Sequence, residues 1–297
     1  MIPEMIADYA CNIGENPLWH PTEQRLYWTD IPTGRLFRFD PATGEHSRIY
    51  QGRQVGGFTF EDSGGLLLFM DRGTIARWKD GIYSEILPFI PSELSSRFND
   101  VFADPAGRVF CGTMSSEQSK GRLYRLDTDG SLHLLLQNIG CSNGMAISRD
   151  HTAFFYTDSF AREIYRFDYE PHSGNISNQT VFARFPEADG LPDGATLDAE
   201  GHLWSALWDG GSIVRLDENG AVAERFPLPV PQVSSLTFGG PDLQDIYVTT
   251  AGGEDRQLHG SLAGALFRFR NLYRGLPEHL SRIGDQPIAL TQQLQGK

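Results

Sequence analysis

The sequence has few cysteines and no long apolar run. Its 297 residues include three cysteines, Cys11, Cys111 and Cys141, which lie far apart without CxxC spacing, so neither a disulfide framework nor a zinc knuckle is indicated. No segment approaches the roughly 18 apolar residues that a membrane span needs, and the first residues, MIPEMIADYACNIGE, lack a basic stretch followed by an apolar one. We therefore expect a cytoplasmic protein with no membrane partner.

Basic stripes and several well-known catalytic motifs are also missing. The formal net charge is −13 and the 25 Lys and Arg residues do not cluster, which argues against a nucleic-acid partner. An acidic protein can instead concentrate cations near its surface. No G-x-S-x-G, Walker A, G-x-G-x-x-G or H-E-x-x-H motif occurs, and the eight His residues are scattered. The reactions that depend on those motifs are therefore not indicated.

What the sequence does contain is a sixfold repeat. Each unit starts at a turn, or corner, that leads into a mostly apolar strand; the corner positions are Glu15, Gly56, Asn99, Asn143, Asp193 and Ser234. A second apolar segment follows each time, at 25–31, 65–71, 108–114, 153–159, 202–208 and 245–251. A third segment alternates apolar and polar residues, at 34–40, 73–79, 121–127, 162–168, 211–217 and 264–270. This alternation is typical of strands with one buried face.

The repeat predicts the fold. Candidate fourth strands lie at 46–51, 83–89, 132–138, 178–185 and 221–229, and none is convincing after residue 270. A period of roughly 40–50 residues with four strands per unit is typical of a β-propeller. We therefore predict an all-β, six-bladed propeller with four antiparallel strands per blade, formed by residues 1–297 as one domain. Residues 5–10 would close the ring, and 271–297 would be a loosely attached tail. A β-sandwich or two β domains would not explain six copies of one pattern.

Repetition separates structural positions from candidate site positions. The third segments carry arginine each time, at positions 38, 77, 125, 166, 215 and 268, and four of them end in aspartate, at positions 40, 127, 168 and 217. A residue that recurs in every blade serves the architecture, so we expect these side chains to brace neighbouring blades. Trp204, Trp208 and Phe238 follow the strand pattern and are expected in the core.

The corner residues differ from blade to blade, as a single site on the axis requires. First strands line the channel of a propeller, so their corners would converge at one mouth. Glu15, Asn99, Asn143 and Asp193 would form an all-oxygen set suited to calcium, magnesium or manganese, with zinc also accommodated. Gly56 would leave room for a substrate ring. The alternative is that these are ordinary turn residues, because Asn-Gly and Asp-Gly are favoured in turns.

Five segments resemble one known family. GENPLWHP, RFNDVFADPAGRVFCGTM, SNGMAISRDHTAFFYTDS, PDGATLDAEGHLWSALW and FGGPDLQDIYVTTA stand in the order found in the senescence-marker-protein, gluconolactonase and luciferin-regenerating-enzyme family, which includes regucalcin. The resemblance implies one divalent metal cation on the axis, held by Glu15, Asn143 and Asp193. It implies substrate contacts from Arg97, Asn99 and Glu117, although the segment around Glu117 is shorter than in the animal members.

The resemblance also implies an activity, the hydrolysis of a small-molecule sugar lactone. Asp193 would be the catalytic base that activates water, with water bound to the cation as the alternative nucleophile. The protein would be a monomer or weak homodimer. A promiscuous esterase or organophosphate hydrolase using the same metal is one alternative. The other is a non-catalytic calcium-binding or interaction propeller, because residues 27–30 read YWTD as in receptor propellers.

Overall fold

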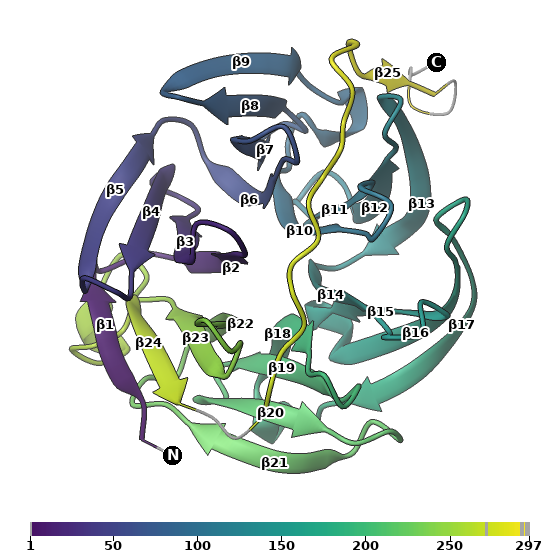
Figure 1. Cartoon of the computed structure of the whole chain (residues 1–297). Coiled ribbons are helices and arrows are strands. Elements are labelled where there is room, and N and C mark those ends of the chain that lie inside the picture. Colours follow the sequence, from purple (N-terminus) through teal and green to yellow (C-terminus); the bar gives the residue numbers. More distant parts are fainter. Residues whose placement is uncertain (1, 271–272, 292–293, 295–297) are drawn as a thin grey trace.

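Six antiparallel sheets surround a central axis in the computed structural model (Figure 1). The structure describes residues 2–270, 273–291 and 294. In each sheet the strands follow one another from the axis to the rim in chain order, except in the last blade. There the N-terminal strand takes the outermost place. The predicted six-bladed propeller is confirmed.

The blades, read from the axis outward, have the following strands. They are β2 (Gly14–His20), β3 (Arg25–Asp30), β4 (Arg35–Asp40) and β5 (Glu45–Gln51); β6 (Val55–Phe60), β7 (Leu66–Met70), β8 (Ile75–Lys79) and β9 (Ile82–Leu87); β10 (Phe98–Ala103), β11 (Val109–Thr113), β12 (Gly121–Leu126) and β13 (Ser131–Ile139); β14 (Ser142–Ile147), β15 (Ala153–Asp158), β16 (Glu163–Glu170) and β17 (Asn175–Arg184); β18 (Leu191–Leu197), β19 (Leu203–Trp208), β20 (Ser212–Leu216) and β21 (Val222–Pro227); and β22 (Val233–Gly239), β23 (Asp245–Thr250), β24 (Ala265–Arg270) and β1 (Glu4–Asp8). Short 3-10 turns lie at η1 (Pro91–Glu93), η2 (Ser159–Ala161), η3 (Glu187–Asp189) and η4 (Arg256–Leu258). Within the described residues, no helix has the length and apolar character needed to cross a membrane.

The ring closes through the N-terminal strand. β1 runs antiparallel to β24, with Met5 opposite Phe267 and Ala7 opposite Leu266. This pairing gives the last blade its fourth strand, and it joins the two ends of the ring through backbone hydrogen bonds. The prediction that residues near 5–10 close the ring is confirmed.

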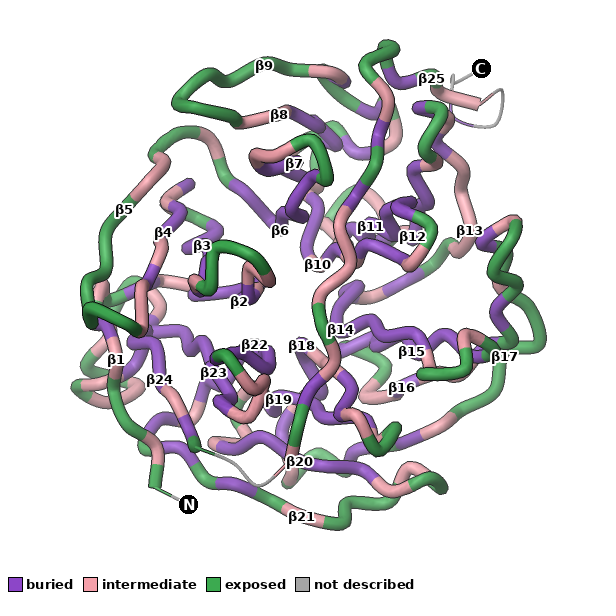
Figure 2. The backbone as a smooth tube through the Cα atoms, viewed as in Figure 1, coloured by how far each residue is buried: buried purple, intermediate pink, exposed green. Residues whose placement is uncertain are grey.

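Burial decreases from the axis to the rim. All residues of the inner strands β6, β14 and β22 are buried, whereas most residues of β5 and β9 are exposed, and Figure 2 shows the same gradient around the ring. The inner strands are packed by neighbouring blades, so they contain apolar and small residues together with buried polar ones. The rim strands have one sheet neighbour and a solvent face, which allows charged and polar residues there.

Each inner strand has a register irregularity at its corner residue. The pairing shifts between Glu15 and Leu18, Val55 and Gly57, Phe98 and Val101, Asn143 and Met145, Pro192 and Ala195, and Val233 and Ser235. Such bulges bend a strand and redirect a side chain, and they are common near active sites. The fold therefore interrupts the regular pleat once per blade at the same end of the channel.

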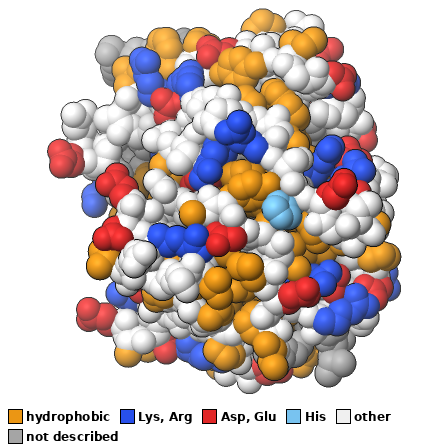
Figure 3. Space-filling view, turned by 90° about the vertical axis from the view of Figure 1, so that its left-hand side faces the viewer, with side chains coloured by type: hydrophobic (Ala, Val, Ile, Leu, Met, Phe, Trp, Pro, Cys, Tyr) orange, Lys and Arg blue, Asp and Glu red, His pale blue; other side chains and the backbone are white. Residues whose placement is uncertain are grey.

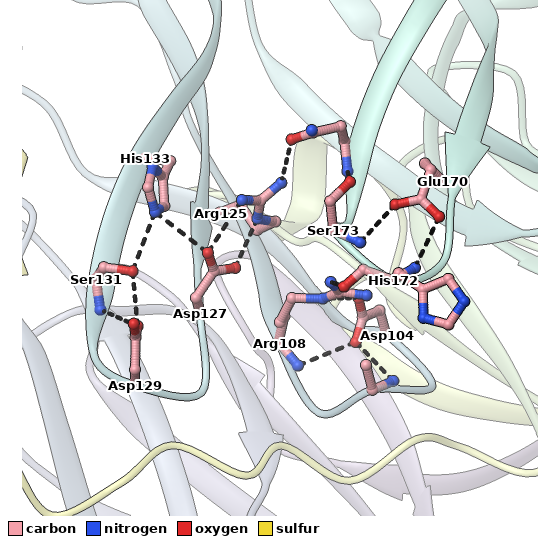
Figure 4. A network of polar contacts seen from close by, with 12 residues as sticks. Asp104, Arg108, Arg125, Asp127, Asp129, Ser131, His133, Glu170, His172 and Ser173 are labelled. Atoms are coloured by element: carbon pink, nitrogen blue, oxygen red, sulfur yellow. Dashed lines mark hydrogen bonds and ion pairs between the residues drawn. The ribbon is translucent and has the colours of Figure 1, made fainter.

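The arginines of the third strands make structural contacts. Arg125 binds Asp127 within its own blade and donates to Asn175 of the next blade, at 2.9 Å between Nη1 and Oδ1. Figure 4 shows this network together with His133, whose ring lies 3.2 Å from Asp127. Arg268 reaches Glu4 of the closing strand at 2.7 Å. The contact of Arg125 with Asn175 joins neighbouring blades as expected, whereas Arg268 and Glu4 belong to the same blade.

The outer face near β1 and β5 mixes charges of both signs. Figure 3 shows basic and acidic side chains side by side on that face, separated by apolar patches. Ion pairs of these two blades include Arg25 with Asp40 and Arg268 with Glu4. Pairs so open to solvent contribute little to stability.

Residues 273–291, here called the C-terminal strap, cross the end of the channel opposite the corners (Figure 1). The strap starts beside two blades, where the amide of Gly275 donates to the Leu243 carbonyl. It then contacts the facing blades, where the Ser281 amide donates to Phe60 and the Arg282 amide donates to Gly107. It ends as β25 (Ala289–Leu290), a short strand parallel to β13. The strap therefore links blades on opposite sides of the ring.

One strap residue gives a pH-dependent prediction. Burial raises the pKa of the Glu278 carboxyl to about 7, partly offset by a hydrogen bond from Thr237, while the charge of Asp100 raises it further. The folded protein therefore retains a proton that the unfolded chain releases near pH 4.5, so stability falls as pH rises through about 7. Urea unfolding at pH 5 and pH 8 should show a smaller loss of stability in Glu278→Gln than in wild type. Equal losses of stability in the two proteins would contradict this role of Glu278.

Candidate active site

A cavity of about 220 Å³ opens at the corner end of the channel. Five of the predicted site residues line it: Glu15, Arg97, Asn99, Asn143 and Asp193. They come from β2, β10, β14 and β18 and from the residue preceding β10. The side chains of Glu15, Asn99, Asn143 and Asp193 are all at least nine-tenths buried. Residues from four separate blades therefore converge on one small space.

A chain of hydrogen bonds joins these residues. Arg97 Nη1 donates to Asn99 Oδ1 at 2.5 Å, and Asn99 Nδ2 donates to Asn143 Oδ1 at 2.8 Å. Asn143 Nδ2 in turn donates to Ser159 Oγ at 2.8 Å, and Ser159 Oγ donates to the Pro192 carbonyl at 2.6 Å. Because the serine hydroxyl gives its proton to a carbonyl, it must accept from Asn143. The orientation of both amides is thereby fixed.

The two carboxylates lack a counter-charge of their own. Glu15 Oε2 accepts one backbone hydrogen bond, from Asn16 at 2.8 Å. Asp193 Oδ1 is buried and has no hydrogen-bond partner within the described part of the chain. A buried acceptor without a partner costs about 1–3 kcal/mol, so this atom marks a place where a ligand fits.

The pKa values of the two cavity carboxyls also indicate a place for a ligand. Burial raises the pKa of Glu15 to about 8, with the charge of Asp100 adding to the effect. Burial also raises the pKa of Asp193 well above its ordinary value, with the charges of Glu15 and Asp100 next in importance. The Arg97 guanidinium opposes these effects only in part, and its own pKa is lowered by burial. The protein alone provides too little positive charge for two ionised carboxylates.

Known proteins resemble this chain over most of its length. The family model described as SMP-30/Gluconolactonase/LRE-like region matches residues 13–252. The chain belongs to this family. Pentonolactonase XacC of Haloferax volcanii is 46% identical over 285 residues, covering 94% of this chain and 97% of the relative. Regucalcin of Gallus gallus is 33% identical, covering 93% and 97%. A solved luciferin-regenerating enzyme superposes with a TM-score of 0.87 at 29% identity, covering 95% and 99%.

The donor set fits the divalent cation that membership of this family implies. Glu15, Asn143 and Asp193 offer oxygen atoms from three blades, and Asp193 Oδ1 has no competing partner. A dication would neutralise the two carboxylates, which otherwise raise the pKa of Asp193 through their mutual repulsion. Oxygen donors suit calcium, magnesium and manganese, and zinc is also accommodated. These three residues could therefore hold the metal.

The remaining predicted site residue is not at the cavity. Glu117 is exposed in the turn between Ser116 and Ser119, where backbone and side-chain hydrogen bonds of Ser116 hold the turn. The residues that line the cavity do not include it. The structure therefore does not bring Glu117 together with Arg97 and Asn99, and its role in substrate binding stays a prediction from the resemblance.

Two expectations about individual residues are wrong. Trp204 and Phe238 are buried core residues, but Trp208 is half-buried and lines the cavity, because it ends β19 at the corner side of the ring. Gly56 does not make room for a substrate. A Cβ there would lie 1.9 Å from the Phe98 carbonyl oxygen, so the neighbouring inner strand requires the glycine.

The sequence reasoning missed the apolar wall residues Ile13, Met114 and Leu191 and three further cavity residues. Ser159 links Asn143 to the Pro192 carbonyl, Cys141 lies 3.6 Å from Asn99 Nδ2, and Phe160 forms part of the wall. None of them stands at a corner. For two of them, the position in the repeat could have indicated a place at the cavity. Cys141 precedes a corner by two residues, and Ser159 follows a second strand directly.

A second group of possible metal ligands lies outside the cavity. The ligand atoms of Asp198, Glu200 and His202 are all within 4.8 Å of one another. The guanidinium of Arg215 donates to all three of these side chains, at 2.5–2.8 Å. This arginine supplies the positive charge that the acidic group requires. The group is an arginine-centred network within one blade, formed by β18–β21 and their connections.

Proposed function

We propose that this protein hydrolyses a sugar lactone to the corresponding aldonic acid. The observation that carries the proposal is the hydrogen-bonded set of Arg97, Asn99 and Asn143 in the cavity that also contains Asp193, whose buried Oδ1 has no partner among the described residues. Its relative from Haloferax volcanii is named a pentonolactonase, which supports a five-carbon sugar lactone as the first substrate to test. Water adds to the ring carbonyl, the ring ester bond breaks, and one proton is released at neutral pH.

Each residue has a role in this reaction. A divalent cation held by Glu15, Asn143 and Asp193 would polarise the lactone carbonyl and stabilise negative charge on its oxygen. Asp193, with Oδ1 free of hydrogen bonds, would orient the attacking water and accept its proton. Arg97 and Asn99 would hydrogen-bond the sugar hydroxyls. Asn99 also orients Asn143 through its amide.

A pH-indicator assay with purified protein tests the proposal. Aldonolactones, aryl esters and paraoxon should be compared with calcium, zinc, magnesium or manganese, and ranked by kcat/KM. We expect aldonolactones to rank first. A higher rank for aryl esters or paraoxon would favour a promiscuous esterase or organophosphate hydrolase. Calcium binding without metal-dependent turnover of any lactone would favour an interaction propeller and contradict the enzyme.

Substitution of Arg97 should weaken substrate binding more than the chemical step. In Arg97→Lys the fork of donors that can contact both Asn99 and a sugar hydroxyl is replaced by one ammonium group. Loss of a hydrogen bond to a charged group costs about 1.5–3 kcal/mol, so KM should rise roughly 10- to 100-fold. Steady-state kinetics on the preferred lactone measure this. A kcat that falls while KM is unchanged would assign Arg97 to the reaction itself.

A further inference from the structure

Phe160 is an exposed aromatic residue on a rigid turn at the cavity. Its side chain is 57% exposed although it belongs to the wall. The turn η2 that carries it is held from both sides. The carboxylate of Asp158 accepts from the amides of Gly140 and Cys141 at 3.0 Å, and the Ser159 amide donates to the Cys141 carbonyl at 3.1 Å. The backbone is therefore fixed while the ring remains open to solvent.

Fixing an apolar ring in solvent gives the folded protein no burial energy. The apolar area of a phenylalanine side chain contributes to stability only when it is removed from water. Exposed apolar groups that cluster often mark ligand sites. Phe160 does not stand alone, because the wall contains four other large apolar residues from other parts of the ring: Ile13, Met114, Leu191 and Trp208.

The polar groups of the cavity are concentrated at its buried end. Asn143 Nδ2 and Ser159 Oγ already use their hydrogen bonds within the protein. Asn99 Nδ2 likewise donates to Ser142 and Asn143, and Arg97 Nη1 donates to Phe98 and Asn99. Among these four residues, the groups left to receive sugar hydroxyls are the other guanidinium nitrogens of Arg97 and the second lone pair of Asn99 Oδ1. A hydroxyl pressed against the apolar wall would lose its water without gaining a partner, which is unfavourable. The wall therefore suits the C–H face of a lactone and disfavours an additional exocyclic hydroxyl.

We propose that Phe160 is a specificity-determining residue that packs against the C–H face of the lactone ring and selects lactones with few exocyclic hydroxyls. The inference rests on the proposed function and deepens it. In this proposal Phe160 contacts the ring of the substrate and not the reacting carbonyl. Its substitution should therefore change KM more than kcat.

The test compares two variants and one control on two lactones. Phe160→Ala should raise KM for a pentono-1,4-lactone roughly tenfold, since the lost apolar contact is worth about one factor of ten in affinity, with kcat within twofold. KM for a hexono-1,4-lactone should change by less than threefold, so the preference for the smaller lactone narrows. Phe160→Tyr, which keeps the ring, should restore the wild-type KM for the pentonolactone.

The control is a second exposed phenylalanine away from the cavity. Phe89 is 43% exposed beside Pro88 and Pro91, and Phe89→Ala should leave both KM values unchanged. An active wild type with no rise in KM for Phe160→Ala would overturn this inference alone. A wild type inactive on every lactone would overturn the proposed function and the inference together. Equal rises in KM for both lactones would overturn the role in selection.

Discussion

Replacing Asp193 by asparagine should lower kcat/KM on the preferred lactone by roughly 10²–10⁴, the range of general-base assistance. The substitution keeps the shape of the side chain but removes the charge that accepts the proton and helps hold the cation. The same variant should be more stable than wild type when metal-free, because burial, followed by the charge of Glu15, disfavours the ionised Asp193 carboxylate. Activity and thermal stability should thus change in opposite directions. Activity within a few-fold of wild type would contradict the base role.

Asp198 provides the matched control, five residues further along the same blade. Its buried carboxylate accepts from Arg215 Nε at 2.8 Å and from Trp204 Nε1 at 2.9 Å, and it does not line the cavity. Asp198→Asn breaks this buried pair and should cost about 3–5 kcal/mol of stability. The protein that remains folded should keep the wild-type kcat. The two variants therefore separate a loss of chemistry from a loss of folding.

Removal of divalent metal should abolish most of the activity. A bound dication supplies several kcal/mol of transition-state stabilisation, so dialysis against EDTA should lower kcat by roughly 10²-fold or more. Separate addition of calcium, zinc, magnesium and manganese should restore the rate with different efficiencies. The order of restoration identifies the cation that the site prefers.

Thermal stability gives a readout of metal binding that does not depend on activity. Ligand at 100 times its Kd stabilises the folded state by about 2.7 kcal/mol, so the metal-free protein should melt several degrees lower. Glu15→Gln should reduce this difference, because it removes one of the two carboxylates. Chelated protein with undiminished turnover and unchanged Tm would show that no cation is needed.

The fold could be predicted because its signals are local and repeated. Glycines and polar residues mark the corners, and apolar runs follow at nearly constant spacing. The closing strand was predictable from the missing partner of β24. The contacts of the strap were not, since residues 273–291 carry no repeat. Their positions depend on backbone groups such as the Phe60 and Gly107 carbonyls, which only the folded ring brings near them.

The cavity could be predicted in part, for a related reason. Glu15, Asn143 and Asp193 stand at repeated positions whose side chains vary, and that contrast marked them. Ser159 has its role only because β18 of the next blade places the Pro192 carbonyl within 2.6 Å. Trp208 looks like any strand residue until the end of β19 is located in space. Properties that arise between blades have no signature within one repeat.

The register irregularities at the corners have a consequence for how such sites diverge. Each one belongs to a single blade, and the strand around it is fixed by its own pairing. A substitution at one corner therefore changes one side chain while the strands that carry the other corners keep their pairing. Evolution can therefore change the side chains at this end of the channel one at a time, while the strands that carry them keep their structure.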